Sequence, residues 1–130
     1  MHEATMLQVM LVAMGGALGA VARYWVSGYV VNNTQHYLPL GTLVVNVLGS
    51  LLMGVCFVLI MEKAQLPPAS RQLLMVGFLG AFTTFSTFSL ETLTLIQEGH
   101  ILSAVIYIVL SLLCCLAALA AGLWLTRLWV

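Results

Sequence analysis

The chain has 130 residues, of which 62% are hydrophobic and only 6% are charged. A soluble domain carries about 25% charged residues, so four acidic and four basic residues cannot give this chain a polar coat. The composition therefore predicts an integral membrane protein, with the lipid bilayer as its solvent. The net charge of zero argues against nucleic acid as a partner, because such binding needs clustered Lys and Arg.

Uncharged segments long enough to cross a bilayer predict a single all-α transmembrane domain, residues 1–130, with four helices. One crossing needs about 20 residues. The uncharged run 24–61 is too long for one helix, and its polar residues 32–37 followed by Pro39 are expected to divide it. The expected helices span about residues 5–30, 40–61, 72–97 and 101–126. The first is interpreted as a retained helix and not a signal peptide, since it lacks a basic start and a small-residue cleavage site.

The basic residues specify the orientation of the chain only weakly. An even number of helices places both termini on one side of the membrane. Lys63, Arg71 and Arg127 fall on that side and Arg23 falls near the other, which favours termini inside by the positive-inside rule. A bias of three against one leaves the orientation poorly specified.

Polar residues inside the membrane carry the functional information, because each is costly without a partner. Residues four apart share a helix face, and the second and fourth helices each have one polar stripe with this spacing. The stripes are Thr42, Asn46 and Ser50 in the second helix and Ser103, Tyr107 and Ser111 in the fourth. One such stripe favours hydrogen bonding between helices, whereas two suggest a lined path. Neither stripe contains a charge, which favours a small anion over a cation.

The expected third helix has a weak centre. Its 26 residues would span about 39 Å, more than the roughly 30 Å hydrocarbon core. Segment 77–89 contains two glycines and then five hydroxyl residues among seven, which lower helix propensity. A break there would free carbonyls that are tolerated only when buried in protein or bound to an ion. Phe85 and Phe88 share a face, and their ring edges can face an anion. The plain interpretation of Glu91, one turn beyond Phe88, is a helix-end residue near the membrane interface, and the sequence leaves its role open.

The glycines of the first helix indicate close helix packing and not a nucleotide-binding loop. Gly15 and Gly19 fit a small-xxx-small packing face, and Arg23 continues the same face one turn on. The cysteines show no metal-binding spacing, and they are interpreted as small apolar fillers. They are Cys56, Cys114 and Cys115.

Three segments together carry a family resemblance: residues 15–24 read GGALGAVARY, residues 41–49 read GTLVVNVLG, and residues 77–91 read GFLGAFTTFSTFSLE. On these segments the chain resembles, over essentially its whole length, the Fluc (CrcB) family of bacterial fluoride channels. The usual family form has a second glycine where this chain has Ala81. That departure is small and leaves a backbone-mediated role intact.

The resemblance implies an assembly and a set of site residues. The assembly is an antiparallel, dual-topology homodimer in the bacterial inner membrane, with the third helix broken mid-membrane and two pores lined by both subunits. A structural sodium ion at the dimer centre would be held by the backbone carbonyls of Gly80 and Thr83. Arg23 corresponds to a vestibule arginine that draws anions inward. The implied pore and fluoride-binding residues are Asn46, Phe85, Ser86, Thr87, Phe88, Tyr107 and Ser111.

The expected function is passive export of fluoride, which gives fluoride resistance and involves no enzyme activity. Neutral HF enters the cell and ionises, and an interior-negative potential of about 100 mV favours anion exit by about 2.3 kcal/mol. Two alternatives stay open. A small multidrug transporter is also a four-helix, dual-orientation dimer, but it needs a membrane-embedded acid in the first helix, which has none after Glu3. In a non-transporting assembly protein, the polar stripes would only join helices.

Overall fold

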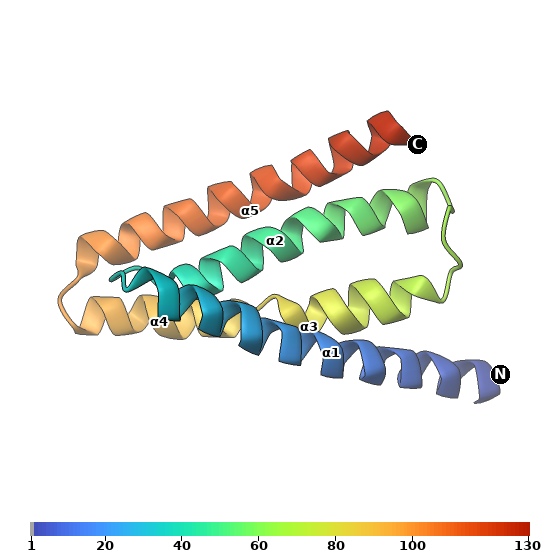
Figure 1. The fold of residues 1–130 in the computed structure, drawn as a ribbon, viewed down its shortest axis with the longest axis horizontal. Helices are drawn as coiled ribbons and strands as arrows, with labels where there is room; N and C mark the ends of the chain where they lie inside the picture. Colours follow the sequence, from blue (N-terminus) through green and yellow to red (C-terminus); the bar gives the residue numbers. More distant parts are fainter. Residues whose placement is uncertain (1) are drawn as a thin grey trace.

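A computed structural model of the chain describes residues 2–130, which form helices and connecting loops without strands. The elements follow one another as α1 (His2–Thr34), α2 (Leu40–Cys56), η1 (Phe57–Glu62), η2 (Arg71–Leu79), α3 (Gly80–Phe82), α4 (Phe85–Gln97) and α5 (Ile101–Trp129) (Figure 1). The two η segments are π-helical. η1 continues α2, and η2 leads directly into α3.

Four helical stretches are long and apolar enough to cross a membrane, as the sequence predicted. They are Thr5–Thr34, Leu40–Glu62, Arg71–Gln97 and Ile101–Trp129. Only 11% to 28% of the most apolar part of each stretch is fully buried within the chain, so much of each stretch stays partly or fully exposed, as helices surrounded by lipid require. Both termini lie at the same end of the bundle (Figure 1), which the even helix number predicted.

The first helix is longer than the sequence predicted. The polar residues after position 30 were expected to end it, but α1 continues to Thr34. The Asn33 side chain donates to the Tyr29 carbonyl at 2.8 Å, and the Thr34 hydroxyl donates to the Val30 carbonyl at 2.7 Å. Each bond runs from a polar side chain to the carbonyl four residues earlier in the same helix, so these residues are satisfied locally without ending it. The helix ends where Gln35 takes a φ of 42°. The last helix, α5, likewise extends beyond the expected residue 126 to Trp129.

The helices associate mainly as two pairs, α1 with η2 and α2 with α5. The first pair confirms the predicted packing face of α1. A Cβ atom on Gly15 would collide with the Leu73 carbonyl, and one on Gly19 would collide with the Phe78 carbonyl. The two backbones are therefore in direct contact, which only glycine allows at these positions.

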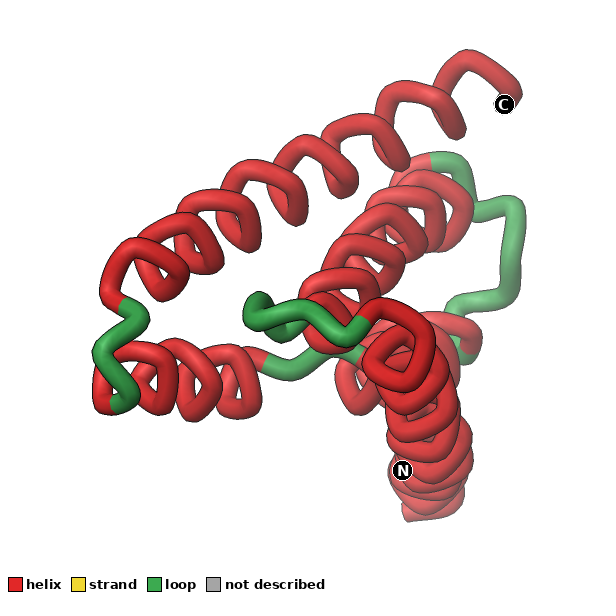
Figure 2. The backbone as a smooth tube through the Cα atoms, turned by 60° about the vertical axis from the view of Figure 1, so that its left-hand side comes forward, coloured by secondary structure: helices red, strands yellow, loops and turns green. Residues whose placement is uncertain are grey.

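The helical path of the third membrane stretch is interrupted between α3 and α4. Thr83 has a ψ of 154°, and Thr84 has φ and ψ of −149° and 120°, which are extended backbone angles. Figure 2 shows the interruption as a short loop between two helical pieces. The interruption lies inside segment 77–89, where glycines and hydroxyl residues lower the helix propensity.

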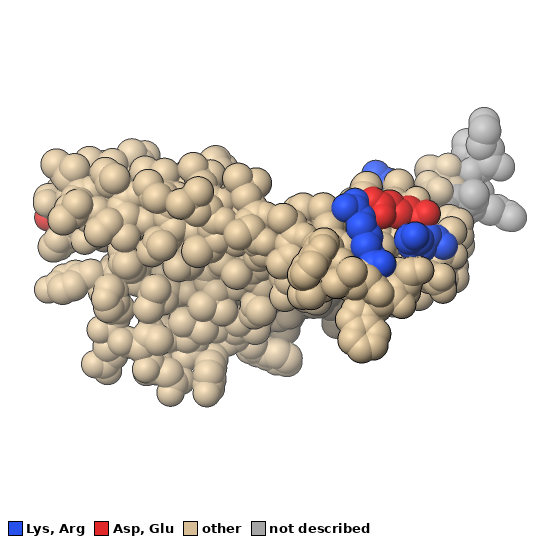
Figure 3. All heavy atoms as spheres, turned by 90° about the horizontal axis from the view of Figure 1, so that it is seen from above, with Lys and Arg blue, Asp and Glu red and all other residues tan. Residues whose placement is uncertain are grey.

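Most of the charged side chains gather at the end of the bundle that carries the termini (Figure 3). Arg127 near the end of α5 makes an ion pair with Glu62 at the end of η1. Lys63 and Arg71 flank the loop that connects η1 to η2. On the face shown, the surface between this end and the opposite one carries no charged side chain over most of its length, as a surface in contact with lipid requires.

Candidate functional site

Side chains from two neighbouring helices hold the interruption of the third membrane stretch. Asn46 of α2 donates its Nδ2–H to the Thr84 carbonyl at 3.0 Å, and its Oδ1 accepts the Thr84 N–H at 2.8 Å. Arg23 of α1 donates from Nε to the Ala81 carbonyl at 3.1 Å. The resemblance assigned Asn46 to the pore and Arg23 to the vestibule. The structure gives both a backbone partner, which leaves one Nδ2–H of Asn46 and the outer nitrogens of Arg23 for other partners.

Glu91 of α4 lies at the centre of a second polar cluster that joins three helices. Its Oε1 accepts from the Thr42 hydroxyl of α2 at 2.8 Å, and its Oε2 accepts from the Tyr107 phenol of α5 at 2.7 Å. Thr42 is 6% exposed and Tyr107 is completely buried. The sequence left the role of Glu91 open. In the structure Glu91 lies within α4, which continues to Gln97, and both carboxylate oxygens face buried partners. A negative charge therefore does lie beside both polar stripes.

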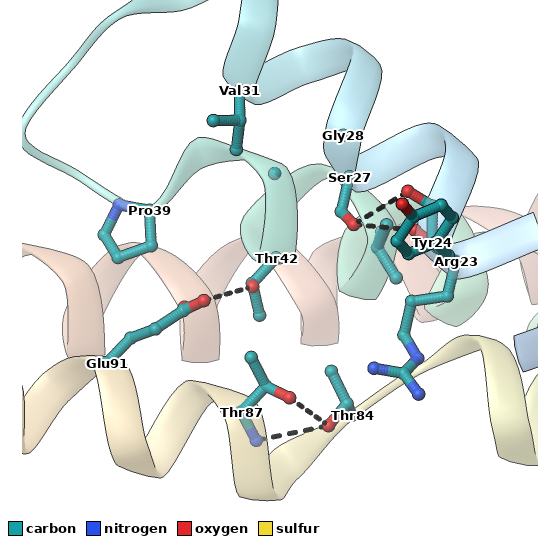
Figure 4. Close-up of a pocket in the computed structure, with 12 residues that line it drawn as sticks. Arg23, Tyr24, Ser27, Gly28, Val31, Pro39, Thr42, Thr84, Thr87 and Glu91 are labelled. Atoms are coloured by element: carbon teal, nitrogen blue, oxygen red, sulfur yellow. Dashed lines mark hydrogen bonds between the residues drawn. The ribbon is translucent and has the colours of Figure 1, made fainter.

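A cavity of about 280 Å³ opens between α1, α2 and α4. Figure 4 shows the Glu91 carboxylate bonded to Thr42 on one side and the Arg23 guanidinium near Thr84 on the other. The hydroxyl of Thr87 also lines this cavity and is bonded to Oγ1 of Thr84 at 3.1 Å. The cavity thus brings one cationic side chain, one anionic side chain and several hydroxyls together within a largely apolar wall.

A second cavity, of about 340 Å³, lies on the other side of the interruption between α2, α4 and α5. Asn46, Phe85, Phe88 and Ser111 all line it, so the structure brings these four predicted pore residues together. Ser111 is 7% exposed, and its hydroxyl has no hydrogen-bond partner within residues 2–130. An unpaired buried hydroxyl is unfavourable, and it is available to donate to a bound guest.

The two predicted pore phenylalanines have different surroundings. The ring of Phe88 packs on Tyr107 with centroids 5.1 Å apart, and on Phe85 with centroids 5.5 Å apart. Phe85 itself is 75% exposed. Phe88 is therefore packed against the core of the chain, whereas the side chain of Phe85 projects from the surface of the chain.

The remaining predicted site residues lie at the interruption itself. Ser86 and Thr87 form the first turn of α4, and both hydroxyls lie within hydrogen-bonding distance of Thr84 Oγ1. Gly80 is the first residue of α3. Thr83 is the residue directly after α3, and the extended segment starts there. Within residues 2–130 no cluster of three or more His, Cys, Asp or Glu could hold a metal. Backbone carbonyls at the interruption are the groups that fit a monovalent cation, since unwound helix carbonyls in membranes coordinate such ions.

Sequence reasoning missed two relationships in this site, and it had a signal for one of them. An acid inside an apolar stretch marks a functional position by default, and Glu91 met that description. Nothing in the spacing indicated that Arg23 would reach the backbone at Ala81, since 58 residues separate them. That contact depends on the close approach of α1 to η2 described above.

Cavities that contain a few polar side chains, on either side of an interrupted membrane helix, are typical of the broad class of membrane channels and transporters. The family model described as "CrcB-like protein, Camphor Resistance (CrcB)" matches residues 10–123, and the chain belongs to this family. The chain is 53% identical over 117 residues to a protein of Hahella chejuensis called "Fluoride-specific ion channel FluC", covering 90% of this chain and 92% of that protein. Proteins of the same name from Saccharophagus degradans and Magnetococcus marinus are 53% and 48% identical, over 89% and 94% of this chain and 86% and 99% of their own lengths.

Proposed function

We propose that this chain is a fluoride-selective passive anion channel that exports fluoride from the cytoplasm and so gives fluoride resistance. The observation that carries the proposal is its 53% identity, over 90% of its length, to a protein named a fluoride-specific ion channel. The match covers 90% of this chain and 92% of that protein, so it is not confined to one helix. A channel of this kind needs no chemical step, so the chain is not an enzyme.

The second cavity supports an anion path on physical grounds. Fluoride is small and strongly hydrated, so it enters a narrow passage only where donors replace its water. The unpaired hydroxyl of Ser111 is such a donor, and Asn46 retains one amide N–H. The ring edges of Phe85 and Phe88 add partial positive charge. The wall also contains apolar side chains, so water competes poorly there and each donor is worth more.

The assembly we propose is an antiparallel, dual-topology homodimer in the bacterial inner membrane. One four-helix subunit leaves the second cavity open on the face where Phe85 is 75% exposed, and a second copy would close it. The weak basic bias between the two ends of the chain is compatible with insertion in both orientations. Each pore would then be lined by residues of both subunits.

A structural sodium ion at the dimer centre completes the proposal. In this arrangement the interruption between α3 and α4 would lie at mid-membrane depth and would present the carbonyls of Gly80 and Thr83 from each subunit to this ion. A buried cation there would neutralise converging carbonyl dipoles and raise the local electrostatic potential for an anion. The ion needs no side-chain ligand, which agrees with the lack of a metal-binding cluster within residues 2–130.

A second candidate function is a proton-coupled transporter of cationic drugs, and the observation that favours it is an acidic residue within a membrane stretch. Such a transporter needs an acid inside the membrane. Glu91 is one, although it lies on the third membrane stretch and not on the first. Its two hydrogen bonds to Thr42 and Tyr107 hold it as a structural carboxylate with both oxygens occupied. This geometry favours the channel, since a transported cation would have to displace both donors.

A fluoride-efflux assay in proteoliposomes separates the candidates. Purified protein is reconstituted in vesicles loaded with potassium fluoride, valinomycin is added to carry the counter-charge, and a fluoride electrode records release. A channel releases fluoride rapidly, and vesicles loaded with chloride instead show no comparable release on a chloride electrode. Absence of fluoride release, together with proton-driven uptake of a cationic dye, would support the drug transporter and reject the channel.

A further inference from the structure

Two side chains take the N–H groups that a continuous helix would give to the carbonyls of Gly80 and Thr83. In an α-helix each carbonyl accepts from the N–H four residues further on. The partner of Gly80 would therefore be Thr84, and the partner of Thr83 would be Thr87. In this structure the Thr84 N–H donates to Oδ1 of Asn46 at 2.8 Å. The Thr87 N–H donates to Oγ1 of Thr84 at 3.2 Å.

The geometry of the segment makes this diversion specific. Asn46 binds both backbone groups of Thr84, with its Nδ2–H on the carbonyl at 3.0 Å as well as its Oδ1 on the N–H. This pairing resembles that between neighbouring β-strands, and it fits the extended angles of Thr84. The carbonyl of Ala81, which lies between Gly80 and Thr83, instead accepts from Nε of Arg23. Side chains thus occupy the carbonyl of Ala81 and bind the N–H groups that would otherwise pair with the carbonyls of Gly80 and Thr83.

We propose that Asn46 and Thr84 are positioning residues of the cation site, because their side chains keep the carbonyls of Gly80 and Thr83 free of helical hydrogen bonds. The inference rests on the proposed sodium site. A carbonyl without a partner is unfavourable inside a membrane, and a bound cation would satisfy it. Asn46 contributes from α2 and acts on Gly80, whereas Thr84 acts through its own N-cap bond on Thr83. The role of Asn46 therefore extends beyond donating to an anion.

The sequence offers a direct probe of the Thr83 carbonyl. Thr83 and Thr84 form the only pair of adjacent threonines in the chain. Protein labelled with carbon-13 at threonine carbonyls and with nitrogen-15 at threonine amides therefore gives a single carbonyl–amide NMR correlation. That one signal reports both the Thr83 carbonyl and the Thr84 N–H. In the wild type it should shift and saturate as sodium chloride replaces N-methylglucamine chloride at constant ionic strength.

Substitutions then test the two side chains. The readout is the sodium midpoint, which is the sodium concentration at which the response is half complete. Asn46→Leu should return the Thr84 N–H to Gly80 and raise the midpoint by about tenfold or more, the usual effect of losing a group that orients a metal ligand. Thr84→Val should also raise the sodium midpoint. Because this variant lacks the threonine pair that gives the NMR signal, its midpoint is measured from the sodium dependence of the melting temperature. Thr84→Ser should restore the wild-type midpoint. Asn33→Leu and Thr94→Val are matched controls, because each wild-type side chain bonds only a carbonyl of its own helix.

The outcomes separate this inference from the channel proposal. A purely structural role would lower the melting temperature equally at every sodium concentration and leave the midpoint unchanged, which would overturn the inference. A wild-type midpoint in Asn46→Leu with reduced fluoride efflux would also overturn it and leave Asn46 as an anion donor only. A wild type without any sodium response removes both the cation site and the inference, while fluoride efflux from the same preparation still tests the channel. If one substitution prevents folding, the other decides, because the two act on different carbonyls.

Discussion

The phenol of Tyr107 donates to Oε2 of Glu91 at 2.7 Å, across the boundary between α5 and α4, and the tyrosine is completely buried. The other carboxylate oxygen is held by Thr42 of α2. Three helices, α2, α4 and α5, therefore meet at one carboxylate. A carboxylate inside a membrane protein is tolerated when it is paired in this way, so the cluster fixes the relative positions of α2, α4 and α5.

Removing the phenol should destabilise the chain without disturbing the rest of the core. Tyr107→Phe keeps the ring that packs on Phe88 but leaves one oxygen of Glu91 without its donor. A buried charged acceptor that loses its partner costs about 1–3 kcal/mol or more, so the melting temperature of the purified protein should fall clearly. Tyr29→Phe is the control, since Tyr29 is 71% exposed. An equal effect of both substitutions would contradict a structural role for the Tyr107–Glu91 bond.

The sequence predicted the number and order of the helices because apolar runs of membrane length are a one-dimensional signal. It also predicted the Gly15 and Gly19 face, because small residues four apart allow helices to touch wherever the partner lies. It could not predict the partner of Glu91, since that depends on how three helices are rotated about their own axes. Hydropathy does not specify such rotations in lipid, where every outward face is apolar.

The hydroxyl of Ser111 should be dispensable for stability and needed for conduction. Its Oγ is buried without a partner within residues 2–130, so Ser111→Ala removes an unfavourable group, and the melting temperature should stay the same or rise. Fluoride efflux from proteoliposomes should nevertheless fall, because a donor lining the second cavity is lost. Ser89→Ala is the control, since the Ser89 hydroxyl bonds only the Phe85 carbonyl of its own helix. A fall in stability with normal efflux would count against Ser111 as an anion donor.

The two pore phenylalanines should respond differently to the same substitution. Isoleucine keeps apolar bulk but removes the aromatic edge. Phe85→Ile should lower fluoride efflux with little change in melting temperature, because Phe85 is 75% exposed in the single chain. Phe88→Ile should lower both, because it also removes ring packing on Tyr107, worth about 0.5–1.5 kcal/mol for an aromatic pair. Phe57→Ile, at a residue 39% exposed on η1, serves as the control. Normal efflux in both pore variants would favour simple packing over an aromatic-edge mechanism.

The antiparallel dimer gives the most demanding prediction, because it concerns a second copy of the chain. Four helices leave the second cavity open beside the exposed Phe85, so another subunit must supply the missing wall. A twofold axis in the membrane plane maps mid-depth onto mid-depth and so lets two interruptions meet at the midplane. A parallel pair has its axis along the membrane normal, which does not enforce that depth.

Dual insertion can be read from the accessibility of one cysteine at the C-terminus, which lies beyond α5 at the end that also carries the N-terminus (Figure 1). Val130→Cys is introduced after Cys56, Cys114 and Cys115 have been replaced by alanine, and intact cells are treated with a thiol reagent that does not cross membranes. An antiparallel dimer requires about half of the chains to be labelled from outside and the rest only after the cells are opened, because both orientations are present in each dimer. Labelling from one side alone, with fluoride efflux intact, would rule the antiparallel arrangement out, since a channel of uniformly oriented chains would then be conducting.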